Sequence, residues 1–240
     1  MPRRKGKFIV IEGSDGVGKK TQADLIIKMF RRIGRQVVFY DFPQYERSFF
    51  GKMVGDYLNE KFGDVNESDP YLISLLYAGD RFEASEHIRH DLNSGKIVIC
   101  NRYTQSNMAF QTAKLKSEKT KKDFLEWLEE LEFGIYNIPK PDMVVYLYAP
   151  HQISQKMVDQ KKARTYTDKK RDIHERNGEF LAQVEKEYLS LAKNNSEWRT
   201  IICTEGDKLL PPDEISKKVF DVVLGKVESR KTKIMPESLF

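Results

Sequence analysis

Short runs of apolar and β-branched residues recur along the chain and predict β-strands. Four of the five runs are almost continuously apolar, as expected for parallel strands covered by helices on both faces. The exception is the second run, in which polar and apolar residues mix. The runs span residues 8–11, 36–40, 97–100, 143–148 and 200–203.

Segments with helical periodicity separate these runs. Gly34 and Gly95 follow the first and third segments as stop signals, and Asp69 and Pro70 suit the N-cap and first turn of the third. Strands that alternate with helices favour a parallel sheet with right-handed crossovers. We therefore predict an α/β, three-layer fold with a central five-stranded parallel sheet and helices on both faces. The predicted helices span residues 19–33, 49–59, 70–92, 119–131, 172–193 and 212–224.

Composition is compatible with one domain over residues 1–240, because 40% of the residues are apolar and neither a repeat nor a linker interrupts the pattern. The charged end, from about residue 226, is expected to be loosely held. The net charge of +5 suits anionic substrates but not a dedicated nucleic-acid binder. No membrane span or signal peptide is expected. Cys100 and Cys203 end two apolar runs, which suggests buried, reduced thiols in a cytoplasmic protein.

A glycine-rich loop directly follows the first predicted strand and opens the first predicted helix. It fits the P-loop pattern G-x-x-x-x-G-K, whose backbone N–H groups and lysine bind a nucleotide polyphosphate. Strand, loop and helix occur in the order that this motif requires, so we expect ATP to bind here. The predicted ATP-binding residues are Gly13, Ser14, Asp15, Gly16, Val17, Gly18, Lys19, Lys20 and Thr21.

Polar and aromatic residues follow the other strands, at the edge where ligands bind in open parallel sheets. Arg102 follows the third strand and could hold a phosphate, while Asn107 and Phe110 lie three residues apart on a short helix. Within the long helix 70–92, Tyr77 and Arg81 share one face and could contact a nucleobase. The alternative for the segment of Asn107 and Phe110 is a hydrogen-bonding network that caps the start of a helix. The alternative for the other pair is that Tyr77 is a core residue and Arg81 a surface residue.

A dense basic stretch at residues 161–171 is either a solvated charge run or a lid. A mobile lid near residues 160–172 would place positive charge over a transferring phosphoryl group.

Taken together, these motifs resemble the thymidylate kinase family over residues 7–222. The resemblance rests on F-I-V-I-E-G-x-D-G at 8–16, K-x-T-Q at 19–22, F-P at 42–43, L-L-Y-A-x-D-R at 75–81, R-Y-x-x-S-N-x-A at 102–109 and P-D at 141–142. It implies transfer of a phosphoryl group from ATP to thymidine monophosphate (dTMP), with Mg²⁺ carried mainly by ATP. A homodimer in the cytoplasm is also implied.

The resemblance further implies roles for individual residues. Lys19, Arg102, Asp15, Arg164 and Arg171 would act in catalysis, the last two from the lid. Asp15 would lie near the 3′-hydroxyl of dTMP, and Arg102 would bind its 5′-phosphate. Tyr77 would stack on thymine, Arg81 and Asn107 would bond it, and Phe110 would pack under the deoxyribose. The remaining implied substrate residues are Phe42, Arg47, Asp172 and His174.

Two positions depart from the family pattern. Lys20 stands where the family has Ser or Thr, and Asn101 where it has Asp. Both positions serve Mg²⁺ in the family, so the metal ligands stay unassigned. Two alternative functions remain open: a deoxynucleoside kinase that phosphorylates a 5′-hydroxyl, with Glu12 as the candidate base, and a degenerate nucleotide-binding protein without activity.

Overall fold

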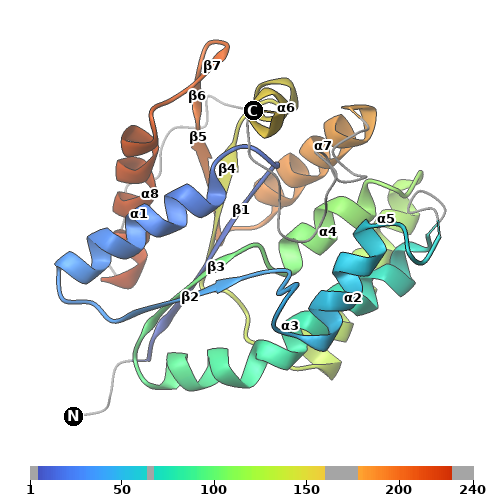
Figure 1. Cartoon of the computed structure of the whole chain (residues 1–240), viewed down its shortest axis with the longest axis horizontal. Coiled ribbons are helices and arrows are strands. Elements are labelled where there is room, and N and C mark those ends of the chain that lie inside the picture. The colour runs from blue at the N-terminus through green and yellow to red at the C-terminus, as the bar shows by residue number, and fades with distance from the viewer. Residues whose placement is uncertain (1–4, 64–67, 160–177, 229–240) are drawn as a thin grey trace.

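The computed structural model describes residues 5–63, 68–159 and 178–228. Its centre is a parallel five-stranded sheet in the order β2-β3-β1-β4-β5 (Figure 1). This arrangement confirms the predicted fold class. The strands are β1 (Lys7–Gly13), β2 (Val37–Asp41), β3 (Ile97–Asn101), β4 (Met143–Tyr148) and β5 (Trp198–Ile202).

Helices cover both faces of the sheet, which explains the continuous apolar runs. In β1, Ile9 and Ile11 pack against α1 (Lys19–Arg32) and α8 (Pro212–Val227) on one face. Phe8 and Val10 alternate with them and pack in the second core, which α3 (Pro70–Asn93), α4 (Thr104–Thr112) and α7 (Gly178–Asn194) share. Because side chains alternate across a strand, a strand buried on both faces must be apolar at every position.

A bundle of helices extends the second layer beyond the sheet (Figure 1). It contains α2 (Phe49–Leu58), α3 and α5 (Glu118–Glu129). Asp69 caps α3 as predicted, since its carboxylate accepts hydrogen bonds from the backbone N–H groups of Tyr71 and Leu72. Gly79 brings α2 and α3 together, because a Cβ there would lie 2.6 Å from the Phe50 ring.

Three elements differ from the sequence-based prediction. The segment after β4 forms α6 (His151–Asp159), and a small hairpin, β6 (Thr204–Glu205) with β7 (Lys208–Leu209), follows β5. The helix expected at 119–131 ends at Glu129 and continues as a π-helical turn, η1 (Glu130–Ile135). Helix α6 spans only nine residues and η1 only six, which is too short for the recurrence of apolar positions to distinguish them from a loop.

Some predictions fall on residues that the structure does not describe. The basic stretch 161–171 and the start of the helix expected at 172–193 lie outside the described residues, as do residues 229–240 of the expected tail. Helix α8 continues to Val227, slightly past the predicted start of that tail.

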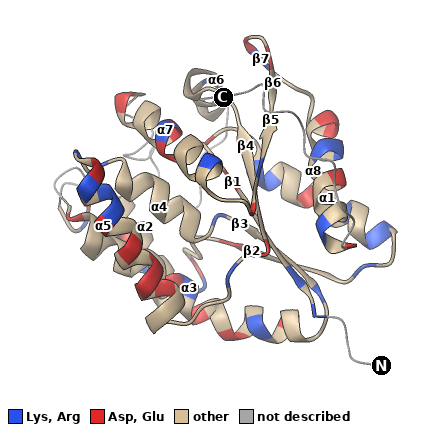
Figure 2. Ribbon diagram, turned by 180° about the vertical axis from the view of Figure 1, so that it is seen from behind, with Lys and Arg blue, Asp and Glu red and all other residues tan. Residues whose placement is uncertain are grey.

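Charged residues of both signs are distributed over the helices, whereas the strands are mostly uncharged (Figure 2). In the part of the chain that the structure describes, no helix is long and apolar enough to cross a membrane.

Candidate functional site

The carboxyl ends of three neighbouring strands bring the candidate site together. Asn101 at the end of β3 is in register with Asp41 of β2 on one side and Ile11 of β1 on the other. The glycine-rich loop follows β1, and Arg102 follows β3 directly. The predicted phosphate-binding groups therefore meet at one edge of the sheet.

The glycine-rich loop depends on glycine for its conformation. Gly13, Gly16 and Gly18 have positive φ angles of 147°, 90° and 93°, which other residues rarely adopt. A Cβ on Gly16 would also lie 2.0 Å from the carbonyl oxygen of Ser154 in α6. Helix α6, which the sequence did not predict, thus packs tightly on the loop. The neighbouring loop residue Val17 is fully buried in the core, while Thr21 is exposed.

Lys19 is held inside this loop. Its Nζ donates hydrogen bonds of 2.9 Å to the carbonyl oxygens of Gly13 and Ser14, and it lies 3.6 Å from Oδ1 of Asp15. Only 7% of the residue is exposed. The ammonium group is therefore fixed at the centre of the loop, close to the carboxylate of Asp15.

Arg102 approaches the same carboxylate from the other side. Its backbone adopts a left-handed φ of 64°, and its guanidinium pairs with Asp15 and donates a 3.0 Å hydrogen bond to Oγ of Ser106. The guanidinium carbon also lies 5.4 Å from the centre of the Phe110 ring. Burial alone would lower the pKa of Arg102, but the charge of Asp15 holds that pKa well above its ordinary value. Asp15 thus joins the two cations, Lys19 and Arg102.

Glu12 is fully buried and accepts hydrogen bonds from the residues that follow Arg102. Its Oε1 accepts hydrogen bonds from the backbone N–H groups of Tyr103 and Ser106, at 2.9 and 3.1 Å. Its Oε2 accepts from the hydroxyls of Ser106 and Tyr188, at 2.7 and 2.9 Å. With both oxygens engaged inside the protein, Glu12 is poorly placed to act as a base toward a substrate hydroxyl.

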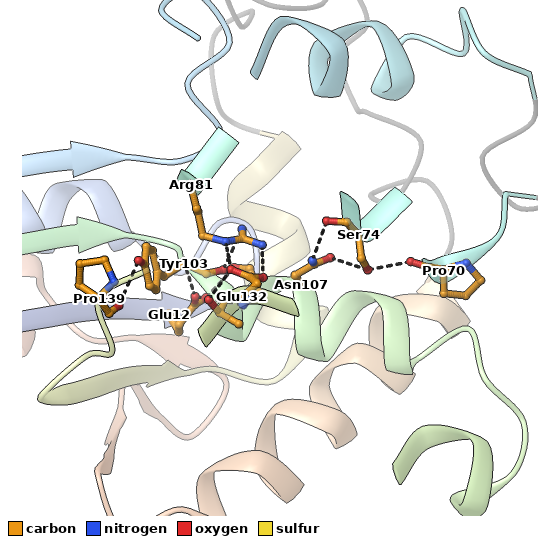
Figure 3. Close-up of polar contacts among 10 residues, drawn as sticks. Glu12, Pro70, Ser74, Arg81, Tyr103, Asn107, Glu132 and Pro139 are labelled. Carbon is orange, nitrogen blue, oxygen red and sulfur yellow. Dashed lines mark hydrogen bonds and ion pairs between the residues drawn. The ribbon is translucent and has the colours of Figure 1, made fainter. Parts of the chain in front are cut away.

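Two of the candidate base-binding residues, Arg81 of α3 and Asn107 of α4, lie where these helices meet (Figure 3). Asn107 and Ser74 are linked by two hydrogen bonds of 3.3 and 3.4 Å. Tyr77 is partly buried and packs against the cluster that contains Tyr57 and Ile73. Arg81 is 2% exposed, so the alternative interpretation as a surface arginine is wrong. Asn107 and Arg81 therefore lie where α3 and α4 meet, whereas Tyr77 packs toward the cluster that α3 forms with α2.

Arg81 has a partner that the sequence did not reveal. Its Nε and Nη2 bond the two carboxylate oxygens of Glu132 at 2.6 and 2.5 Å. Glu132 lies in the π-turn η1, 51 residues from Arg81, so no local spacing could have linked them.

Two further predicted substrate residues lie in the segment after β2. Phe42 is 4% exposed, and its ring centre lies 5.8 Å from that of Tyr103. Arg47 is exposed. The predicted residues Arg164, Arg171, Asp172 and His174 lie outside the described residues.

The two departures from the family pattern meet at Asp41, which sequence reasoning missed. Asn101 Nδ2 donates a 2.6 Å hydrogen bond to Asp41 Oδ1, and Lys20 Nζ lies 3.5 Å from Asp41 Oδ2. Among the described residues, Asn101 Oδ1 is buried without a hydrogen-bond partner, and no group of three or more His, Cys, Asp or Glu is placed to hold a metal. The family pattern has an Asp at the position of Asn101, at the end of β3. In this chain the neighbouring carboxylate is that of Asp41, at the end of β2.

Comparison with known proteins agrees with this geometry. A family model described as thymidylate kinase matches residues 11–210. The thymidylate kinase of Mycobacterium tuberculosis is 31% identical over 187 residues, which cover 77% of this chain and 85% of that protein. The thymidylate kinase of Arabidopsis thaliana is 30% identical over 225 residues, covering 93% and 73%.

A solved structure of thymidylate kinase from Candida albicans has the same fold. It superposes with a TM-score of 0.68 and covers 97% of this chain and 96% of its own, at 21% sequence identity.

Proposed function

The chain belongs to the thymidylate kinase family, and from this membership we propose that it transfers the γ-phosphoryl group of ATP to dTMP, giving the diphosphate. The observation that carries the proposal is the position of Asp15 between Lys19 and Arg102. On this proposal, Lys19 and its loop bind the donor phosphates, and Arg102 binds the acceptor phosphate. One carboxylate therefore joins the two cations that in-line transfer requires.

In this reaction the protein supplies position and charge. The phosphate of dTMP is already ionised near neutral pH, so transfer needs no general base. Lys19 and Arg102 would stabilise the charge that spreads over the transferring group. The engagement of Glu12 by four donors further disfavours the alternative of a deoxynucleoside kinase, in which Glu12 would be the base.

An acceptor assay tests the proposal. With ATP and Mg²⁺, we expect turnover of dTMP and no ADP formation above background with thymidine. Lys19→Ala is the negative control, because it removes the loop ammonium that binds phosphate. Faster turnover of thymidine would support the deoxynucleoside kinase instead, and nucleotide binding without turnover of either acceptor would support the inactive binder.

We further propose that Mg²⁺ enters with ATP and is held weakly by the protein. The residues present fit a hydrated ion, because Asp41 and the partnerless Oδ1 of Asn101 supply the oxygen ligands that Mg²⁺ prefers. When bound, the ion neutralises the phosphates of ATP. Lys20 weakens the binding of the ion, since its ammonium group competes with Mg²⁺ for the carboxylate of Asp41.

The double variant Lys20→Ser/Asn101→Asp tests this proposal about the metal. It removes the competing ammonium and adds a carboxylate beside Asp41. The free Mg²⁺ concentration at half-maximal rate is expected to fall about tenfold, equivalent to about 1.4 kcal/mol of added attraction. Lys218→Ser, which removes a lysine from an exposed ion pair with Glu214, should leave it unchanged. An unchanged or higher requirement in the double variant would contradict the proposal.

We also propose a cytoplasmic homodimer, as the family resemblance implies. Large apolar side chains are exposed on two adjacent helices: Phe49 of α2 is 67% exposed, and Leu72 and Phe82 of α3 are 65% and 49% exposed. We assign these side chains to the proposed dimer interface, because exposed apolar side chains lose contact with water when two protomers associate. Both cysteines are free and buried, which suits a reducing compartment.

A further inference from the structure

The ion pair between Arg81 and Glu132 is the most deeply buried one among the described residues. Their side chains are 3% and 0% exposed. Both guanidinium–carboxylate bonds are short, and Thr104 Oγ1 donates a third hydrogen bond of 2.8 Å to Glu132 Oε2. A buried carboxylate with this many donors is held in one orientation, and it fixes the guanidinium in turn.

An unusual backbone places Glu132 there. After α5 the chain widens into the π-turn η1, and the carbonyl oxygen of Glu132 accepts a 3.0 Å hydrogen bond from the backbone N–H of Ile138. π-turns are rare and are often found at functional sites, because their wider backbone redirects a side chain. Here the redirected side chain is the carboxylate that meets Arg81.

The pairing engages only part of the guanidinium. Glu132 accepts one hydrogen bond from Nε and one from Nη2 of Arg81. Nη1 makes a long contact of 3.5 Å with the carbonyl oxygen of Tyr103. Arginine has more N–H donors than these contacts use. In Figure 3 the guanidinium lies between Tyr103 and Asn107, where α3 and α4 meet.

We propose that Glu132 is a positioning residue that sets the base selectivity of this kinase, a role that rests on the proposed function. Glu132 keeps Arg81 in one orientation, in which its remaining N–H groups face the base. Because arginine only donates hydrogen bonds, this edge accepts a pyrimidine with a carbonyl at C4 and rejects one with an amino group there. Selectivity for thymine over cytosine thus depends on a residue that does not touch the base.

Glu132→Gln tests the proposal, because the amide keeps the size of the side chain but loses the charge and one acceptor. The KM for dTMP is expected to rise about tenfold, and the ratio of kcat/KM for dTMP to that for dCMP to fall about tenfold. The kcat for dTMP and the KM for ATP should change less than about twofold. A purely structural role would not separate the two substrates in this way.

Two variants serve as comparisons. Glu197→Gln makes the same chemical change in an exposed ion pair with Lys226 and should leave every constant unchanged. Thr104→Val removes one hydrogen bond from Glu132 and keeps the ion pair, so its effect on the dTMP to dCMP ratio should be intermediate.

If Glu132→Gln does not fold, Glu132→Asp carries the same test, because it retracts the carboxylate by one methylene and should loosen Arg81. A folded Glu132 variant that keeps the wild-type ratio of dTMP to dCMP turnover would overturn the inference. This result is distinct from failure of the proposed function, in which the wild-type protein itself would not phosphorylate dTMP.

Discussion

Replacing Arg102 with methionine is expected to lower kcat/KM for dTMP by about 1000-fold while the KM for ATP changes less than about twofold. Methionine keeps much of the length of the side chain but removes the guanidinium that meets Asp15 and Ser106. The group that binds the acceptor phosphate and stabilises the transferring charge is then lost, whereas Lys19 and the glycine-rich loop stay in place. Steady-state kinetics with each substrate varied separately measure the effect.

Arg102→Lys separates charge from geometry. Lysine keeps the positive charge but lacks the planar guanidinium, whose several N–H groups can bond Asp15 and a phosphate at the same time. We expect a smaller loss for this variant, of about 10- to 100-fold in kcat/KM.

The matched control is Arg89→Met, since Arg89 is an arginine whose guanidinium bonds the carbonyl oxygen of Asn137 in an exposed contact. It should leave dTMP turnover at the wild-type rate. If Arg102→Met lost no more activity than this control, Arg102 would not be the acceptor-phosphate group, and the assignment of the site would be wrong.

The sequence predicts the parts of this site that are local in the chain. The glycine-rich loop is contiguous, and it stands between a strand and a helix in the order that the motif requires. The unbroken apolar run of residues 8–11 predicts a strand that is covered on both faces. These features follow from steric limits and from side-chain periodicity, which operate between near neighbours.

The sequence does not predict the partners that hold the functional residues. Glu132 lies 51 residues from Arg81, and it reaches Arg81 from a π-turn that has no periodic signature. Asp41 gains its role only because β2 and β3 pair in register, which places it beside Asn101. Such contacts depend on which elements become neighbours, and a single sequence does not reveal that pairing.

Glu12→Ala is expected to lower the free energy of unfolding by about 3–5 kcal/mol. Glu12 is fully buried, and its removal would leave the backbone N–H groups of Tyr103 and Ser106 without acceptors in the interior. The hydroxyl of Tyr188 would lose an acceptor as well. Unpaired buried donors and the cavity both destabilise the folded state. Urea denaturation of the purified variant measures the loss.

Glu12→Gln should be milder, with a loss of about 1–2 kcal/mol. The amide oxygen can still accept from the two backbone N–H groups, and the amide nitrogen can donate to the hydroxyls of Ser106 and Tyr188, which can rotate to accept.

The exposed pair of Glu197 with Lys226 provides the control, because Glu197→Ala should cost no more than about 1 kcal/mol. An equal loss in Glu12→Ala and Glu197→Ala would show that Glu12 does not hold the start of α4 in place. An equal loss in Glu12→Ala and Glu12→Gln would instead show that the negative charge of Glu12, which acts electrostatically on Arg102, and not its hydrogen bonds, accounts for its contribution.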